Sequence, residues 1–237
     1  MATNQDAEKR LAAAGAVRHV ESGMRVGLGS GSTALHLVRL LGERIKQEGL
    51  QIVGVPTSRA THDLAREVGI PLAEDLSGFE LDLAIDGVDQ VTRAGWIIKG
   101  GGGAMLQERI VAAAAKRFIV IADHSKLVER LGGFPLPVEV FALGWKNVQR
   151  RIAEIGGRPR LRCDAQGKPR LTDQGNYILD CDFSSESLAA AQSLARTLRS
   201  LPGVADHGLF LGMAERLIIA RGEECEEIML PLAVAGH

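Results

Sequence analysis

A lysine followed by four glycines, Lys99 to Gly103, is the segment of this sequence best suited to chemistry. Four consecutive glycines weaken both helices and strands, so they indicate backbone that passes close to a ligand or offers it several N–H groups. The lysine would add a point positive charge, which suits an enediolate or alkoxide oxygen. The simpler alternative is a flexible loop with a solvated lysine. We expect Lys99, Gly100, Gly101 and Gly102 to line a substrate site.

Glu108 follows Lys99 by nine positions and lies about one turn into a predicted helix over residues 104–115. Ala104 and Ala112 stand four residues before and after it, and these small neighbours leave room beside the carboxylate. A glutamate in the first turn of a helix commonly does no more than complement the helix dipole. Glu108 is therefore a candidate base only in combination with Lys99.

A second glycine-rich segment, residues 26–33 (VGLGSGST), lies where a predicted strand turns into a helix. Backbone N–H groups at a helix start bind anions such as phosphate. The dinucleotide pattern G-x-G-x-x-G does not fit, since positions 32 and 34 are not glycine, and the lysine of a P-loop is missing. A capped turn without ligand is the alternative. The expected phosphate-binding residues are Ser30, Gly31, Ser32 and Thr33.

Two aspartates follow a predicted strand over residues 81–85, in the run Asp86-Gly87-Val88-Asp89. Ligands of parallel sheets bind beyond the carboxyl ends of the strands, so both aspartates are well placed. They could bind sugar hydroxyls, move protons during ring opening or hold Mg²⁺. An aspartate-rich turn that bonds its own backbone is the alternative.

Two lysines could add positive charge to the same site. Lys126 follows another apolar strand and could neutralise a phosphate, whereas Lys9 lies in the first predicted helix. Either would by itself be a solvated surface residue. Thr57 and Ser58 open a further helix, for which capping is the favoured interpretation over phosphate contact.

The composition excludes several classes of function. Net charge is −1 and aromatic residues make up 4%, which argues against a nucleic-acid or membrane-surface partner. No apolar run is long enough to span a bilayer, and no signal peptide precedes the first helix. The three cysteines are far apart and odd in number, which favours free thiols. We expect a cytoplasmic protein without a metal site.

The predicted elements indicate two lobes. Up to about residue 131, strands alternate with helices, which is typical of a Rossmann-like α/β domain with a mainly parallel sheet. After the Pro/Gly-rich hinge the order strand-helix-strand-strand-helix suggests a smaller α+β domain of the ferredoxin-like, split βαβ type. Strands over 209–211 and 217–220 could return to the first sheet. The predicted division is 1–131 plus 206–237 for the larger domain and 132–205 for the smaller one.

Taken in order, these motifs resemble the ribose-5-phosphate isomerase A family. The resemblance runs from about Lys9 to Ala220 and rests on the ordered set rather than on any single motif. The matching runs are Gly-Ser-Gly-Ser-Thr at 29–33, Asp-Gly-x-Asp at 86–89, Lys-Gly-Gly-Gly-Gly-Ala at 99–104, Asp-x-Ser-Lys at 123–126, Phe-Pro-Leu-Pro-Val-Glu-Val at 134–140, Gly-Asn-Tyr-Ile-Leu-Asp at 175–180 and Pro-Gly-Val at 202–204.

The resemblance implies an aldose-ketose isomerase that interconverts ribose 5-phosphate and ribulose 5-phosphate through an enediolate, in the non-oxidative pentose phosphate pathway. It implies Glu108 as the base, Lys99 as the oxyanion stabiliser, and Asp86 and Asp89 as partners of the sugar hydroxyls. It also implies a homodimer and no metal or organic cofactor. Gln90 departs from the family, which typically has Glu there, and this removes one negative charge beside the site.

Three other functions compete with this interpretation. A non-catalytic sugar-phosphate sensor would be expected to lack Glu108 or Lys99 and to carry a DNA-binding domain. An acyl-CoA transferase would use a glutamate as nucleophile, and stable labelling of Glu108 by acyl-CoA would support it. A nucleotide-binding oxidoreductase ranks last because the glycine pattern is missing.

Overall fold

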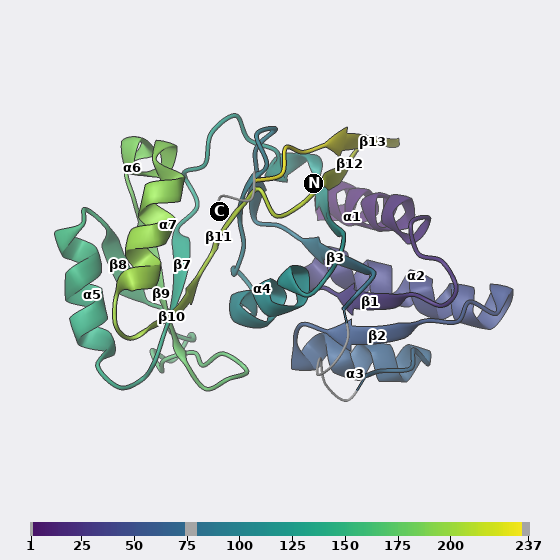
Figure 1. Cartoon of the computed structure of the whole chain (residues 1–237), viewed down its shortest axis with the longest axis horizontal. Coiled ribbons are helices and arrows are strands. Elements are labelled where there is room, and N and C mark those ends of the chain that lie inside the picture. Colours follow the sequence, from purple (N-terminus) through teal and green to yellow (C-terminus); the bar gives the residue numbers. More distant parts are fainter. Residues whose placement is uncertain (1, 74–79, 234–237) are drawn as a thin grey trace.

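A six-stranded sheet forms the centre of the larger lobe, with strand order β13-β12-β6-β3-β1-β2 (Figure 1). The computed structural model describes residues 2–73 and 80–233. Neighbouring strands are parallel except for the hairpin of β12 and β13. The strands are β1 (Arg25–Leu28), β2 (Val53–Pro56), β3 (Leu83–Gly87), β6 (Phe118–Asp123), β12 (Arg216–Arg221) and β13 (Glu224–Met229).

Strand β6 shows why this sheet is parallel and covered on both sides. Each of its residues is buried, and successive side chains point to opposite faces. Ile119 and Ile121 belong to one core cluster, whereas Val120 and Ala122 belong to the other. A continuous apolar run of this kind is typical of a strand with helices or other layers on both faces.

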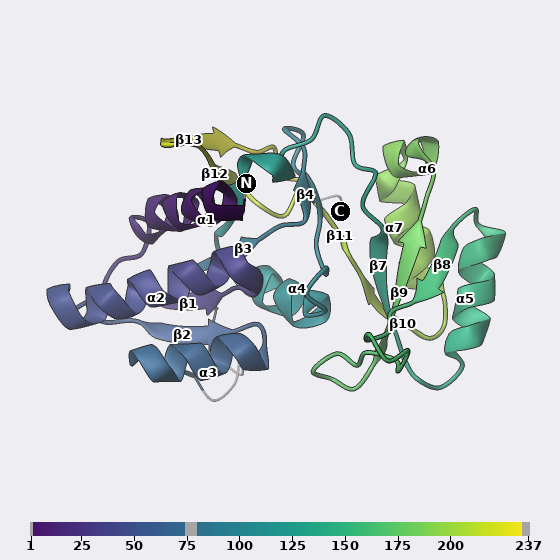
Figure 2. The same ribbon diagram turned by 180° about the vertical axis from the view of Figure 1, so that it is seen from behind.

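Helices cover the two faces of the sheet unequally. One face packs against α1 (Ala2–Val17), α2 (Gly31–Glu48) and α3 (Arg59–Val68), and the other packs against α4 (Met105–Ala113). Figure 2 shows this arrangement from behind. The carboxyl ends of β1 and β3 therefore face the start of α2 and the start of the loop that precedes α4.

A separate three-stranded antiparallel sheet connects the two lobes. It contains β4 (Gln90–Val91), β5 (Trp96–Ile98) and β11 (Leu209–Leu211), in the order β11-β5-β4. The expectation that residues 209–211 return to the first sheet was wrong, whereas 217–220 do join it as part of β12. The reason is local: Lys99 N–H donates to the Gly208 carbonyl, which continues the pairing of β5 with β11.

The smaller lobe has the predicted ferredoxin-like, split βαβ topology. Its four antiparallel strands lie in the order β10-β7-β9-β8. Strand β10 extends to His207, and the division of the chain into 1–131 plus 206–237 and 132–205 stays a prediction. In chain order the elements are β7 (Leu136–Val140), α5 (Trp145–Glu154), β8 (Arg158–Leu161), β9 (Tyr177–Asp182), α6 (Ser185–Ala189), α7 (Ala191–Ser200) and β10 (Val204–His207).

The two faces of this small sheet have different partners. Val138, Leu179 and Cys181 belong to a core cluster shared with α5 and α7. Because side chains alternate along a strand, Glu139 on β7 and Asp180 on β9 lie on the opposite face. On that side the small lobe meets α4 and the loop that precedes it.

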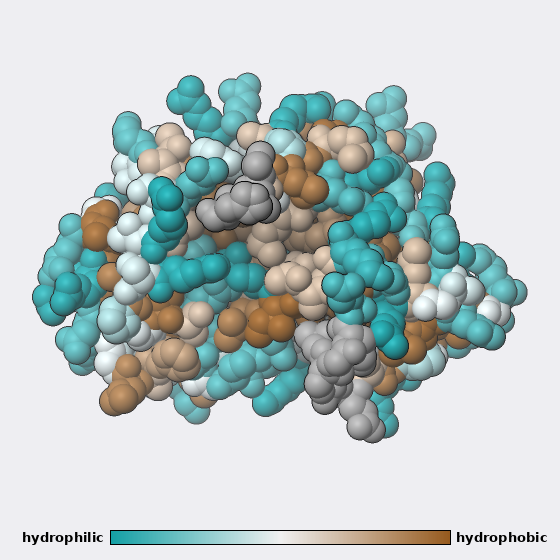
Figure 3. Space-filling view, viewed as in Figure 1, coloured by the Kyte–Doolittle hydropathy of each residue, from teal (hydrophilic) through white to brown (hydrophobic). Residues whose placement is uncertain are grey.

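The surface between the lobes is hollowed. In Figure 3 hydrophilic residues dominate the outline of this face, while more hydrophobic residues line the hollow near its centre.

Within residues 2–73 and 80–233, no helix combines the length and the apolar character needed to cross a membrane.

Candidate active site

The turn from β1 into α2 brings backbone N–H groups to one end of a cavity. Gly29 follows the strand and Gly31, with φ of 83°, begins the helix. A Cβ on Gly29 would lie 2.3 Å from Asp86 Oδ1, so a glycine is required where these segments touch. Ser32 and Thr33 then line the cavity from the first turn of α2, where N–H groups are free to bind an anion.

The hydroxyl of Ser30 is engaged with a neighbouring strand end. Its Oγ lies 2.6 Å from Thr57 Oγ1, and Thr57 donates in turn to the Leu28 carbonyl at 3.0 Å. Ser30 is therefore the donor in this pair, so its hydroxyl hydrogen is already in use. The helix cap of α3 is Ser58, which accepts from Thr61 N–H, as the sequence favoured.

Asp86, the penultimate residue of β3, is a buried carboxylate that pairs with Lys99. Its residue is 3% exposed, and its Oδ1 accepts hydrogen bonds from Ser30 N–H at 2.9 Å and Gly87 N–H at 2.7 Å. The other oxygen, Oδ2, lies 3.0 Å from Lys99 Nζ. This carboxylate holds Ser30, at the turn into α2, and Lys99 together.

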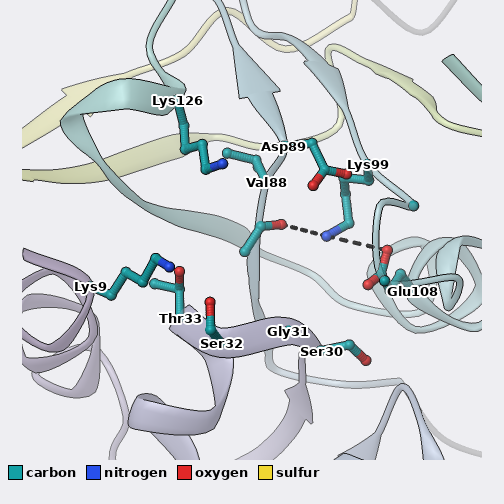
Figure 4. Close-up of a pocket in the computed structure, with 13 residues that line it drawn as sticks. Lys9, Ser30, Gly31, Ser32, Thr33, Val88, Asp89, Lys99, Glu108 and Lys126 are labelled. Atoms are coloured by element: carbon teal, nitrogen blue, oxygen red, sulfur yellow. Dashed lines mark hydrogen bonds and ion pairs between the residues drawn. The ribbon is translucent and has the colours of Figure 1, made fainter. Parts of the chain in front are cut away.

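Lys99 and Glu108 face each other inside the protein (Figure 4). The Lys99 ammonium donates to the Gly87 carbonyl at 2.5 Å and lies 3.4 Å from Glu108 Oε2. Glu108 is 6% exposed, and among the described residues its Oε2 has no hydrogen-bond partner. Glu108 also lines the cavity, and a buried carboxylate with only a loose ion-pair partner keeps a high affinity for a proton, which suits proton exchange with a bound molecule.

The charges of these three groups are strongly perturbed. Burial raises the pKa of Glu108 to about 8, although the Lys99 charge opposes this. Burial also raises the pKa of Asp86, again opposed by Lys99. For Lys99 burial lowers the pKa, but the neighbouring carboxylates of Asp86 and Glu108 outweigh it and raise the pKa. Asp86 has the shorter ion pair and two N–H donors, so it keeps the negative charge and Glu108 takes up the proton.

The glycine loop after Lys99 is held by the second aspartate. Gly101 N–H donates to Asp89 Oδ2 at 2.7 Å, and a Cβ on Gly101 would lie 2.5 Å from Asp89 Oδ1. Asp89 itself lines the cavity. Its carboxylate can therefore meet a hydroxyl of a bound sugar while it also fixes the loop.

These elements line an open cavity of about 510 Å³, a volume that includes the solvent at its mouth. Figure 4 shows Lys9, Lys126, Ser32 and Thr33 gathered away from the Lys99 and Glu108 pair. The lining residues are Lys9, Ser30, Gly31, Ser32, Thr33, Gly87, Val88, Asp89, Lys99, Gly100, Gly102, Glu108 and Lys126.

Two of the residues expected to line the site do not border the cavity. Asp86 is covered by Lys99, and Gly101 is turned toward Asp89, so neither borders the cavity. Sequence reasoning missed Arg162, whose side chain reaches the Gly100 and Gly101 carbonyls from the smaller lobe. No pattern near Arg162 signals this contact, because the contact depends on how the lobes meet.

Gln90, the departure from the family pattern, points to the segment between the lobes. Its Nε2 donates to the Gly132 carbonyl at 2.6 Å, and Gly132 N–H donates to its Oε1 at 3.0 Å. An amide satisfies both backbone groups, whereas a carboxylate could only accept. Gln90 therefore tethers β4 to the chain that enters the smaller lobe.

One cluster among the described residues has metal-ligand side chains close together. Glu8, Asp123 and His124 lie with their ligand atoms within 4.8 Å of one another. Glu8 Oε2 already lies 2.6 Å from His124 Nδ1, and Glu8 Oε1 accepts from Gly222 N–H. The cluster does not border the cavity described above.

The chain is similar to proteins of one known family over most of its length. The model of a family described as ribose 5-phosphate isomerase A (phosphoriboisomerase A) matches residues 53–224. The chain is 51% identical over 225 residues to ribose-5-phosphate isomerase A of Roseiflexus castenholzii, covering 94% of this chain and 95% of that protein. A solved structure of ribose 5-phosphate isomerase A from Methanocaldococcus jannaschii superposes with a TM-score of 0.88 at 37% identity, covering 93% and 97% of the two chains. A D-ribose-5-phosphate isomerase in complex with phospho-erythronic acid gives a TM-score of 0.91 at 34% identity, with coverage of 95% and 99%.

Proposed function

The chain belongs to the ribose-5-phosphate isomerase A family and interconverts ribose 5-phosphate and ribulose 5-phosphate, and we propose that the residues around Lys99 carry out this reaction. The reaction is a step of the pentose phosphate pathway. The observation that supports the assignment is the buried pair of Lys99 and Glu108 in the cavity that also contains the start of α2.

Glu108 is the base in this proposal. Its ionised carboxylate takes the C2 proton of the open-chain aldose, which leaves an enediolate with negative charge on O1. The proton of the C2 hydroxyl then moves to O1, and Glu108 returns its proton to C1, which gives the ketose. A carboxylate whose pKa is raised to about 8 is a strong enough base to do this near neutral pH. Triosephosphate isomerase likewise uses a glutamate as its base.

Lys99 and the glycine loop stabilise the enediolate. The ammonium is buried, so its attraction for a developing oxyanion is weakly screened. Gly102 borders the cavity, and its backbone N–H has no acceptor among the described residues, so in this proposal it is a second donor to the oxyanion. Asp86 keeps Lys99 charged and in place, which is a supporting role rather than contact with sugar.

Asp89 is assigned to the sugar hydroxyls. It borders the cavity, so it can accept the hydroxyl proton that moves when the furanose ring opens. The phosphate lies in this proposal at the first turn of α2, with Lys9 and Lys126 beside it. Phospho-erythronic acid, the ligand of a related isomerase, is a four-carbon sugar-acid phosphate and suits a site of this shape.

The enediolate route is tested by running the reaction in D₂O with a chelator present and following the products by NMR. Exchange of a base-bound proton with solvent predicts deuterium at C1 of ribulose 5-phosphate. Complete retention of the original hydrogen, or a loss of turnover in chelator, would instead point to a metal-assisted hydride shift.

We also propose a cytoplasmic homodimer. Two observations support it: the cysteines are free thiols, and apolar Phe141 and Leu143 are exposed on the smaller lobe at 51% and 92%. Sedimentation equilibrium at several concentrations tests the assembly. A mass of one chain at all concentrations contradicts it.

A further inference from the structure

Arg162 connects the smaller lobe to the glycine loop of the active site. Its Nη1 donates to the Gly100 carbonyl at 2.9 Å and to the Gly101 carbonyl at 3.0 Å. The side chain is 13% exposed, so both hydrogen bonds are shielded from water. These are contacts between a charged donor and backbone, which are stronger than neutral ones.

The direction of these carbonyls fixes the direction of the neighbouring N–H groups. In a trans peptide the C=O and the following N–H point opposite ways. The Gly100 carbonyl faces Arg162, and the N–H of the same peptide unit, on Gly101, donates to Asp89. The Gly101 carbonyl also faces Arg162, so the Gly102 N–H points away from it, toward the cavity that Gly102 lines.

Arg162 is itself held in one orientation. Its Nε and Nη2 donate to the two oxygens of Asp180 at 2.9 and 2.5 Å, a bidentate fork. Asp180 lies on β9, and Arg162 directly follows β8, so two paired strands fix both partners. The loop from β8 to β9 also contacts the larger lobe, where Arg59 N–H donates to Asp173 at 2.8 Å.

We propose that Arg162, fixed by Asp180, is a positioning residue that aims the Gly102 N–H at the enediolate oxygen. Without its two bonds, the Gly101–Gly102 peptide loses the partner of its carbonyl and can rotate, since glycine has the widest range of backbone conformations. The Gly100–Gly101 peptide is still held by Asp89 and by the Gly103 N–H. The smaller lobe thereby completes an oxyanion site whose charged members all belong to the larger lobe. This inference rests on the proposed role of the glycine loop.

Steady-state kinetics of Arg162→Met test the proposal, because methionine keeps the length of the stem but has no donor. We expect kcat to fall about 10- to 100-fold, somewhat less than the loss on removing an oxyanion-hole donor outright. We expect KM within about threefold and an unchanged inhibition constant for inorganic phosphate, which reports the far end of the cavity. A general loosening of the fold would weaken phosphate binding as well.

Arg160→Met is the matched control. Arg160 lies two residues earlier on β8 and pairs with Asp182 of β9 at 2.7 Å, but it is 66% exposed and has no contact with the glycine loop. Its kcat should equal that of the wild type. If Arg162→Met fails to fold, Arg162→Lys decides the matter, with a loss of about three- to tenfold expected because one nitrogen cannot reproduce the fork.

A folded Arg162 variant with kcat within twofold of the wild type would overturn the proposal. So would a loss that lies in KM and in phosphate inhibition rather than in kcat. Either result leaves the isomerase assignment intact, provided that Glu108→Gln still loses activity.

Discussion

Lys99 Nζ lies 3.4 Å from Glu108 Oε2, and both side chains are almost wholly buried. A cation and a candidate base are thus held in contact without being joined by a tight hydrogen bond. The base stays available for a carbon-bound proton, while the cation stays available for the oxygen that becomes charged.

Replacement of Glu108 by Gln should remove most of the activity and leave binding nearly intact. The amide keeps the size of the carboxylate but cannot take a proton, and positioned general bases contribute about 10²- to 10⁴-fold. Turnover of ribose 5-phosphate should fall within this range, with KM changed by a small factor. Glu67→Gln, on the exposed side of α3, is the control. A Glu108→Gln enzyme with unchanged kcat would assign the base elsewhere.

The pH profile should follow ionisation of Glu108. Its pKa is raised to about 8, so the carboxyl is protonated at lower pH and the base form increases as pH rises. We expect kcat/KM to rise from pH 6.5 through about 8 and to level off above about pH 9, since kcat/KM reports groups of the free enzyme. The range avoids the second ionisation of the substrate phosphate, near 6. A flat profile would contradict the assignment.

Glu108 should also lower thermal stability at high pH. Its pKa is raised on folding, so the stability it contributes is fully present below pH 4.5 and is lost as pH rises through about 8. Glu108→Gln removes this loss. The Tm difference between Glu108→Gln and wild type should therefore grow from pH 5 to pH 9. Calorimetry of both proteins without substrate measures it, and a constant difference across this range would refute the expectation.

Lys126→Met should weaken substrate binding with little effect on the chemical step. Lys126 borders the cavity near the start of α2, away from Glu108 (Figure 4). A hydrogen bond to a charged group contributes about 1.5–3 kcal/mol, which corresponds to a KM increase of about 10-fold or more. Lys116→Met, which removes an exposed ion pair with Asp82, should leave KM unchanged. A fall in kcat at constant KM would exclude phosphate contact.

Gln90→Glu should destabilise the protein, although the family typically has Glu at this position. The carboxylate could not donate to the Gly132 carbonyl and would face it at 2.6 Å. An unsatisfied, partly buried acceptor costs about 1–3 kcal/mol, and each kcal/mol lowers Tm by about 2–4 °C at this chain length. The loss should be smaller at pH 4, where a protonated carboxyl can donate. Equal Tm values at pH 8 would show that the segment adapts.

The sequence predicts most of the cavity because its residues follow strand ends. Ser32, Asp89 and Lys126 each come directly after an apolar strand, so a parallel sheet gathers them at one edge. The burial of Asp86 behind Lys99 does not follow from spacing, since it depends on where the lysine side chain runs. Arg162 was missed for a similar reason: it is brought to the loop by the contact between lobes.

The elements that escaped prediction are short or polar. Strand β4 has two residues, too few to show a period of two, whereas the strands expected over 96–98 and 209–211 coincide with β5 and β11. Strand β13 contains Glu224, Glu226 and Glu227 and lies at the sheet edge, where one side is open to water. Its polar residues hide it from a search for apolar alternation, and acidic edges also discourage pairing with other chains.

Contacts at the carboxyl ends of β1 and β3 fix the distance between the two ends of the cavity. Gly29 N–H donates to the Ile85 carbonyl, and the Asp86 carboxylate accepts from Ser30 N–H and pairs with Lys99, so the start of α2 and Lys99 are held at a fixed separation. A phosphate seated at the first turn of α2 thus sets how many carbons separate it from Glu108. With phosphate bound as proposed, a sugar phosphate with one carbon more or less would present the wrong C–H bond to the base, so we expect the enzyme to select its substrate by length.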